Sequence, residues 1–133
     1  MKMVLFILQN AYKSEKHQFK NEEEWSSELN RSQTGRRLKE LIPENVLYRV
    51  INASDIIGDH VDSCYAPNLE HLKAWINVIA PDIIVACGKV VQKGCDLLGE
   101  KYIKSPHPAW RALSKVHTTS IKNQILNAVS NET

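Results

Sequence analysis

The chain has 133 residues, of which 43% are hydrophobic and 24% are charged, and its formal net charge at pH 7 is +2. This size and composition predict a single globular domain over residues 1–133, with a hydrophobic core of its own. No apolar stretch approaches the length of a membrane span, and a net charge this small does not by itself indicate a partner.

The charges are unevenly distributed along the chain. Acidic residues concentrate early, as in the run of three glutamates at 22–24, whereas no acidic residue lies between Lys101 and Asn131. Such an asymmetry favours a partner that presents negative charge on one side. A solvated surface remains the commoner explanation of any single lysine.

The cysteines and the N-terminal segment indicate a compartment. Cys64, Cys87 and Cys95 are odd in number and lack a Cys-x-x-Cys spacing, so neither a zinc site nor a disulfide framework is expected. Free thiols are typical of a reducing cytosol. The apolar run within residues 1–8 is too short for a signal peptide, and no cleavage site follows it. We therefore predict a cytoplasmic protein.

The N-terminal part of the chain predicts two strands separated by a long loop and a helix. The continuous apolar run from Met3 to Leu8 is typical of a parallel strand that is buried on both faces. Residues 13–30 are mostly polar and predict a long loop, in which residues 22–29 are the candidate for a helix. A second helix begins at residues 32–35 and ends at a proline, and residues 46–51 form the second strand.

The middle of the chain predicts a helix, a strand and a further helix. Residues 55–67 are expected to be irregular, and Asn68 is expected to cap a helix that Pro81 ends. Residues 82–87 form a third buried strand. Gly88 then lets the chain turn directly into the next helix.

The C-terminal part contains a short strand, a stiff turn and a last helix. Residues 101–104 predict the fourth strand, and the sequence Ser-Pro-His-Pro at 105–108 cannot continue it, because proline lacks the N–H that a ladder needs. The turn therefore holds His107 at the end of the strand. We expect Thr118 or Thr119 to cap the final helix.

Apolar strands separated by helices predict an α/β fold with a parallel sheet. Right-handed crossovers bring the carboxyl ends of all parallel strands to one edge, where such sheets bind their ligands. Five candidate residues lie just past the ends of predicted strands, namely Asn10, Tyr12, Asn52, Gly88 and His107. We therefore expect a site at this edge.

The residue types at this edge suit a polar, planar ligand. The amide of Asn52 can pair with the edge of a nucleobase, and a neutral His107 can donate a hydrogen bond to a developing anion. Tyr12, Phe19 and Trp25 are candidate stacking faces. The alternatives stay open that Asn52 only caps a turn and that Trp25 belongs to the core.

The sequence lacks the motifs of dinucleotide-binding proteins and of serine hydrolases. No glycine-rich phosphate loop follows the first strand, and no Gly-x-Ser-x-Gly elbow occurs. Cys87 lies in an apolar strand, so we interpret it as a core residue and not as a nucleophile.

Four stretches resemble, in order, the motifs of the uracil-DNA glycosylase superfamily. Residues 103–108 (Ile-Lys-Ser-Pro-His-Pro) resemble its Lys-Ala-Pro-His-Pro-Ser stretch, and residues 84–94 resemble its third strand and helix, Leu-Leu-Trp-Gly-x-x-Ala-Gln-Lys-Lys-Gly. Residues 8–12 (Leu-Gln-Asn-Ala-Tyr) are similar to the water-activating motif Gly-Gln-Asp-Pro-Tyr, and residues 50–52 (Val-Ile-Asn) to the base-reading Leu-Leu-Asn. The chain departs from these motifs at Leu8, at Asn10, where the uracil-specific branch has Asp, and at Ala11 and Ala109.

The resemblance implies a fold and an activity. It implies a three-layer α/β/α domain whose four-stranded parallel sheet has the order 2-1-3-4. It implies a monofunctional DNA glycosylase of base-excision repair, which hydrolyses the N-glycosidic bond of uracil or of a related deaminated or modified base after base flipping. Asn10 would hold the attacking water, and His107 would stabilise the departing base anion.

The resemblance also implies the remaining site residues and the partners. The base would be bound by Gln9, Tyr12, Phe19 and Asn52. The DNA would be contacted by Gly88, Lys89, Pro106, Pro108, Ala109, Trp110, Arg111 and Lys115. The expected protein is a monomer without cofactor, metal or membrane partner, which binds uracil-containing or otherwise modified DNA, single-stranded or mismatched.

Two alternative functions remain open. The departures at Leu8, Ala11 and Ala109 favour a glycosylase-fold DNA-binding or interaction protein with weak or no catalysis. A small-nucleotide enzyme that uses the same pocket is the third hypothesis.

Overall fold

The computed structural model describes residues 2–9, 33–54, 66–108 and 113–131. Within them, four parallel strands form one sheet in the order β2-β1-β3-β4. The strands are β1 (Met3–Leu8), β2 (Leu47–Asn52), β3 (Ile83–Cys87) and β4 (Ile103–Ser105). The parallel sheet and its strand order are as predicted.

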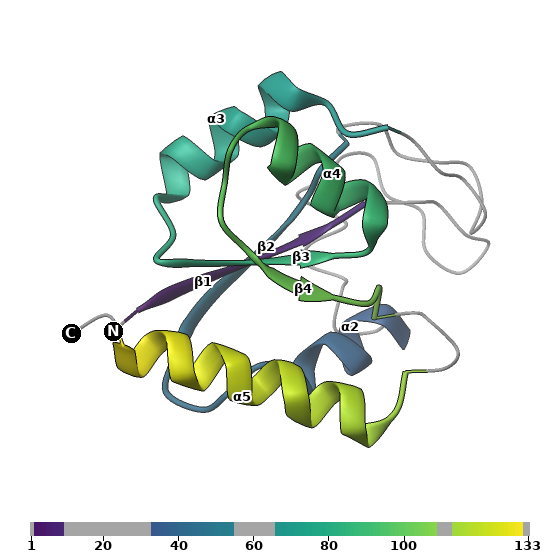
Figure 1. Cartoon of the computed structure of the whole chain (residues 1–133), viewed down its shortest axis with the longest axis vertical. Coiled ribbons are helices and arrows are strands. Elements are labelled where there is room, and N and C mark those ends of the chain that lie inside the picture. The colour runs from purple at the N-terminus through teal and green to yellow at the C-terminus, as the bar shows by residue number, and fades with distance from the viewer. Residues whose placement is uncertain (1, 10–32, 55–65, 109–112, 132–133) are drawn as a thin grey trace.

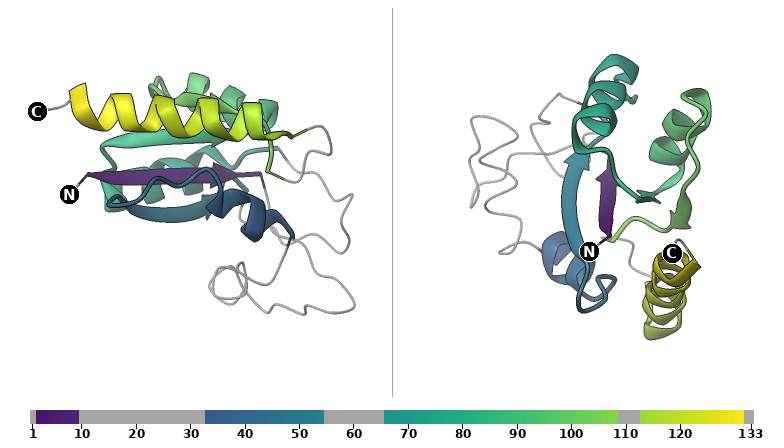
Figure 2. Two further views of the ribbon diagram at one scale, coloured as in Figure 1. Left: turned by 90° about the horizontal axis from the view of Figure 1, so that it is seen from below. Right: turned by 90° about the vertical axis from the view of Figure 1, so that its left-hand side faces the viewer.

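Helices cover both faces of the sheet (Figure 1). One face carries α3 (Leu69–Ile79) and α4 (Lys89–Leu97), and the other carries α2 (Gln33–Lys39) and α5 (Lys115–Asn131). The right-hand view of Figure 2 shows the sheet between the two helical layers. The predicted three-layer α/β/α arrangement is therefore confirmed. No helix in the described part of the chain is long and apolar enough to cross a membrane.

The two helical layers explain why β1 is apolar throughout. Successive side chains of a strand point to opposite faces, and both faces of β1 are covered. Val4, Phe6 and Leu8 belong to the core cluster on the side of α2 and α5, while Leu5 and Ile7 belong to the cluster on the side of α3 and α4. A polar residue in this strand would be buried whichever face it occupied.

Each helix contributes a few buried side chains to the cluster beneath it. On the first side these are Leu38 and Leu41 of α2 and its following turn, with Ile121 and Ile125 of α5. On the second side they are Leu72 and Ile76 of α3, with Val91 and Cys95 of α4. Burial of this apolar surface is what attaches the helices to the sheet.

The predicted cap of the last helix is wrong. Helix α5 begins at Lys115, so Thr118 lies inside it, and the Oγ1 of Thr118 donates to the carbonyl of Lys115 at 3.1 Å. Ser114 precedes the helix, and its backbone N–H donates to Nδ1 of His117 at 3.2 Å. A threonine inside a helix can donate its hydroxyl to a carbonyl of the preceding turn. Thr118 does so and therefore does not act as the cap of α5.

The start of α3 is as predicted. The side chain of Asn68 accepts a hydrogen bond from the backbone N–H of His71 at 3.1 Å, and Asn68 itself has extended backbone angles. At the other end, Ala80 adopts the left-handed conformation with φ of 48° directly before Pro81. Both ends of α3 are thus specified by local sequence.

We expect Asn68→Ala to lower the free energy of unfolding by about 1 kcal/mol, since the first turn of α3 loses its side-chain acceptor. Urea denaturation followed by circular dichroism measures this change. The control is Asn68→Asp, which keeps an oxygen at the same place and should retain most of the stability. An equal loss in both variants would contradict the capping role.

Candidate functional site

A groove of about 560 Å³ lies at the carboxyl ends of β3 and β4. Its walls are formed by Gly88, Lys89, Gln92, Lys104, Ser105, Pro106 and His107. Open parallel sheets bind their ligands beyond the carboxyl ends of the strands. The groove therefore lies at the edge where the sequence predicts a site.

Two backbone features form this groove. Gly88 follows β3 with φ of 94°, a left-handed angle that disfavours side chains, and a Cβ there would lie 3.8 Å from the Cβ of His107. The N–H of Gly88 donates to the carbonyl of Ser105 at 2.8 Å. Pro106 then ends β4, because it has no N–H to continue the ladder. The ends of β3 and β4 are thus joined directly beside His107.

His107 is partly buried in the wall of the groove. Burial disfavours the charged ring and lowers the pKa of His107 below its usual value of 6.5. At pH 7 the ring is therefore neutral, with one N–H donor and one acceptor nitrogen. Such a ring can donate one hydrogen bond to an anion while it carries no charge itself.

The groove is positively charged. Lys89 and Lys104 both line it and are exposed, and the lining residues within the described part of the chain include no carboxylate. Lys89 is also the first residue of α4, where the aligned peptide dipoles of a helix place partial positive charge. These charges favour an anionic ligand in the groove.

The structure brings together some of the predicted site residues. Gly88, Lys89, Pro106 and His107 all line the groove. Pro108 is buried directly after them, and its carbonyl lies 3.5 Å from Nη1 of Arg37 in α2.

Gln9 and Asn52 lie on the neighbouring strands and do not line the groove. Gln9 directly follows β1, and its carbonyl accepts from the N–H of Ser54 at 3.0 Å. Asn52 is the last residue of β2 and is 0% exposed. Nε2 of His71 lies 3.2 Å from the carbonyl oxygen of Asn52. Since a carbonyl can only accept, this nitrogen carries the ring hydrogen.

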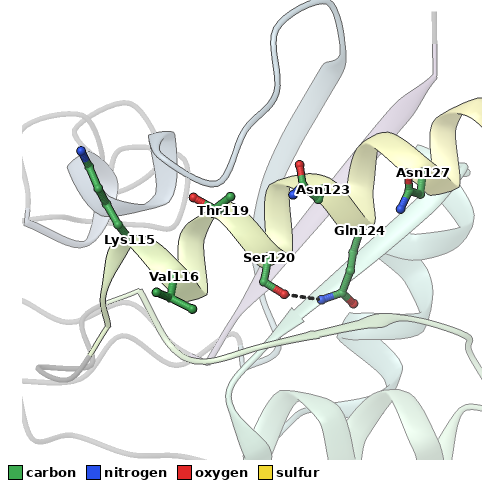
Figure 3. A pocket seen from close by; sticks show the side chains of 7 residues that line it. All are labelled: Lys115, Val116, Thr119, Ser120, Asn123, Gln124 and Asn127. Carbon is green, nitrogen blue, oxygen red and sulfur yellow. Dashed lines mark hydrogen bonds between the residues drawn. The ribbon is translucent and has the colours of Figure 1, made fainter.

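Lys115 lies away from the groove. It begins α5 and lines a separate depression of about 600 Å³ with Val116, Thr119, Ser120, Asn123, Gln124 and Asn127. Figure 3 shows these side chains along one side of the helix, where Nε2 of Gln124 donates to Oγ of Ser120 at 3.4 Å. The structure therefore does not bring Lys115 and His107 into one site.

Several predictions fall outside the described residues. These are the site residues Asn10, Tyr12, Phe19, Ala109, Trp110 and Arg111, the helix expected near 22–29, and Cys64. Cys87 is described, and burial raises the pKa of its thiol to about 12. It stays protonated at neutral pH, which confirms its interpretation as a core residue. Among the described residues, no group of three or more His, Cys, Asp and Glu side chains could hold a metal ion.

The sequence-based prediction missed three lining residues, Gln92, Lys104 and Ser105. Gln92 lies four residues after Gly88, and residues four apart share one face of a helix, so this spacing was a usable signal. Lys104 and Ser105 directly precede Pro106, and neither residue type by itself indicates a place in a groove.

No family model matches this sequence, and neither a curated protein nor a solved structure matches the chain. Function must therefore be inferred from the chemistry of the groove. A neutral imidazole, two lysines and the start of a helix can bind an anion and stabilise charge that develops beside it.

Proposed function

We propose that the protein is a monofunctional DNA glycosylase, which removes uracil or a related deaminated base. The observation that carries the proposal is the neutral His107, which lies in a cationic groove at the carboxyl edge of the sheet. The ordered resemblance to the uracil-DNA glycosylase motifs supplies the substrate class.

The cationic groove suits a nucleic acid backbone. The side chains of Lys89 and Lys104 can neutralise phosphates and release their counterions. A glycosidic bond is hidden inside a duplex, so the base must be flipped out, with least cost from a mismatch or a single strand. Phosphate contacts beside His107 would hold the flipped nucleotide at the sheet edge.

His107 would act on the leaving group. As the glycosidic bond breaks, its electron pair moves onto the base, and a hydrogen bond from a neutral ring strengthens as that charge develops. Water completes the reaction by adding its oxygen to the sugar, and the proton that it gives up ends on the base anion. On the resemblance, Asn10 holds this water, but an amide cannot take the water's proton as a carboxylate can. We therefore expect slow turnover.

The other roles follow from the resemblance. Asn52 would read the flipped pyrimidine edge together with Gln9, and Tyr12 would exclude thymine by crowding the C5 position. We also propose a cytoplasmic monomer that needs no cofactor. Its free, buried Cys87 and Cys95 are typical of a reducing compartment.

One observation favours a second candidate, a DNA-binding protein that does not excise bases. Asn52 is 0% exposed and does not line the groove, so reading a base would require a movement at the end of β2. The cationic groove would bind DNA without such a movement.

An end-labelled oligonucleotide that contains one uracil, treated with alkali after incubation with the protein, distinguishes the candidates. We expect strand cleavage at the uracil and none in a matched oligonucleotide with thymine. A mobility shift without cleavage would contradict the glycosylase and support the binding protein. Neither cleavage nor a shift would reject both.

A further inference from the structure

The side chain of Gln92 bridges two strands of the sheet. Its amide nitrogen, Nε2, lies 3.2 Å from the carbonyl oxygen of Ala86 in β3 and 3.1 Å from that of Ser105 in β4. An amide nitrogen carries two hydrogens, and each can be donated to one of these oxygens. A single side chain from α4 thus joins the carboxyl ends of both strands.

The chemistry of the two partners fixes the orientation of this amide. Reversing it would set Oε1 of Gln92 against two carbonyl oxygens, neither of which can donate a hydrogen bond. The assignment of nitrogen and oxygen, which is often ambiguous for glutamine, is therefore determined here.

The bridge supports the point at which the His107 turn begins. Ser105 is 2% exposed and is the last residue of β4, and its carbonyl also accepts from the N–H of Gly88 at 2.8 Å. Its hydroxyl donates to the carbonyl of Pro106 at 2.8 Å. The next residue after Pro106 is His107, so the position of Ser105 determines where the ring lies.

β4 is a short strand. It has three residues and, among the described strands, lies at the edge of the sheet and pairs with β3 alone, from Val85↔Ile103 to Cys87↔Ser105. Pro106 cannot add a further ladder bond. The two side-chain bonds from Gln92 therefore add to the bond from the N–H of Gly88 in aligning the two strand ends.

We propose that Gln92 is a positioning residue, which holds the ends of β3 and β4 together and thereby fixes the turn that carries His107. Its effect on the reaction rests on the proposed function, while its effect on the ring of His107 does not. Gln92 acts through Ser105 and does not itself donate to the leaving base.

The first test replaces Gln92 with Met, which has a similar length and no hydrogen to donate. We expect a folded protein with nearly unchanged affinity for a uracil oligonucleotide and a single-turnover excision rate lower on the order of tenfold, because a small misplacement of a reacting group is costly. The matched control is Leu97→Met, at an exposed position of the same helix, which should leave the rate unchanged.

The second readout needs no catalysis. Titration of the His107 ring by NMR should show its pKa moving back toward 6.5 in Gln92→Met, because a displaced turn exposes the ring to water. Should Gln92→Met fail to fold, Gln92→Glu replaces it. The excision rate of Gln92→Glu, relative to that of the wild type at the same pH, should rise as the pH falls. A protonated carboxyl regains one hydrogen that it can donate to a strand carbonyl, whereas the ionised carboxylate has none.

These readouts separate two kinds of failure. An unchanged His107 titration together with an unchanged rate per folded molecule would overturn the positioning role. If the wild type excises no uracil, the glycosylase is rejected, and the His107 titration alone decides the role of Gln92. A shifted titration supports it, and an unshifted one overturns it.

Discussion

Replacing His107 with Ala is expected to lower the single-turnover rate of uracil excision by about 100-fold or more, the usual effect of removing one preorganised donor. The ring lies in the wall of the groove, and burial keeps it neutral at pH 7. Without it, the charge that develops on the departing base has no protein donor at this position. The measurement is cleavage of a uracil oligonucleotide with the protein in excess.

The matched variant is His107→Gln, whose amide keeps a neutral donor and should retain more activity than His107→Ala. Both should unfold at urea concentrations close to that of the wild type, because the ring is only partly buried. A large loss of stability with unchanged activity per folded molecule would make His107 a structural residue instead.

The lowered pKa of His107 also predicts how the stability of the protein changes with pH. In the unfolded chain the ring takes up a proton near pH 6.5, while the folded chain resists protonation to lower pH. The contribution of this group to stability is therefore complete above pH 6.5 and is lost as the pH falls through the folded pKa. His107→Gln should remove this part of the acid sensitivity.

Leu72→Ala is expected to lower the free energy of unfolding by about 2–5 kcal/mol, the range for removing a large side chain from a packed core. Leu72 is 0% exposed in the cluster on the side of α3 and α4. Its Cδ2 would lie 3.4 Å from a Cβ at Gly94, so α3 and α4 meet at this side chain. The total free energy of unfolding of a typical domain is about 5–15 kcal/mol, so this loss would be a large part of it. Urea denaturation at several temperatures measures the loss.

Leu97→Ala is the control for this prediction. Leu97 is also a helical leucine, but it is 64% exposed, so its truncation leaves no cavity. A change within about 0.5 kcal/mol is expected. Equal losses in the two variants would contradict the prediction. They would mean that the core around Leu72 relaxes to fill the space and that the packing of α3 against α4 at this side chain contributes little to stability.

The strands with continuous apolar runs could be predicted closely. β1 spans Met3–Leu8, as the sequence indicated. Both faces of this strand are buried, so it is apolar along its whole length and its ends are marked by the first polar residues. The fourth strand was expected at residues 101–104 and lies at Ile103–Ser105. Its limits depend on pairing with β3, which begins at Val85↔Ile103. The residue types in this segment do not reveal which residues of β3 and β4 pair, so the limits of β4 could not be predicted from them.

The site could be predicted where backbone constraints reveal it. Gly88 and His107 could be recognised because glycine permits the positive φ of a sharp turn and the prolines beside His107 restrict the backbone, and both residues line the groove. Gln92 could not be recognised by type, since its role depends on carbonyls from two strands. The resemblance predicts Lys115 as a DNA contact, but it begins α5 and lines a different depression.

The groove has a further property that concerns how the chain folds. Its lining residues among those the structure describes all fall in the range from Gly88 to His107, in the β3–α4–β4 unit and the turn that follows it. Forming that unit closes the loop from Val85 to Ile103, which is roughly a quarter as long as the loop from Val4 to Ile83 that joins β1 to β3. Each doubling of loop length costs about 0.6 kcal/mol of closure entropy, so the longer loop costs about 1.2 kcal/mol more. The edge that carries the groove thus belongs to the part of the sheet with the lower contact order, and the larger entropic cost of completing the sheet lies in pairing β1 with β3.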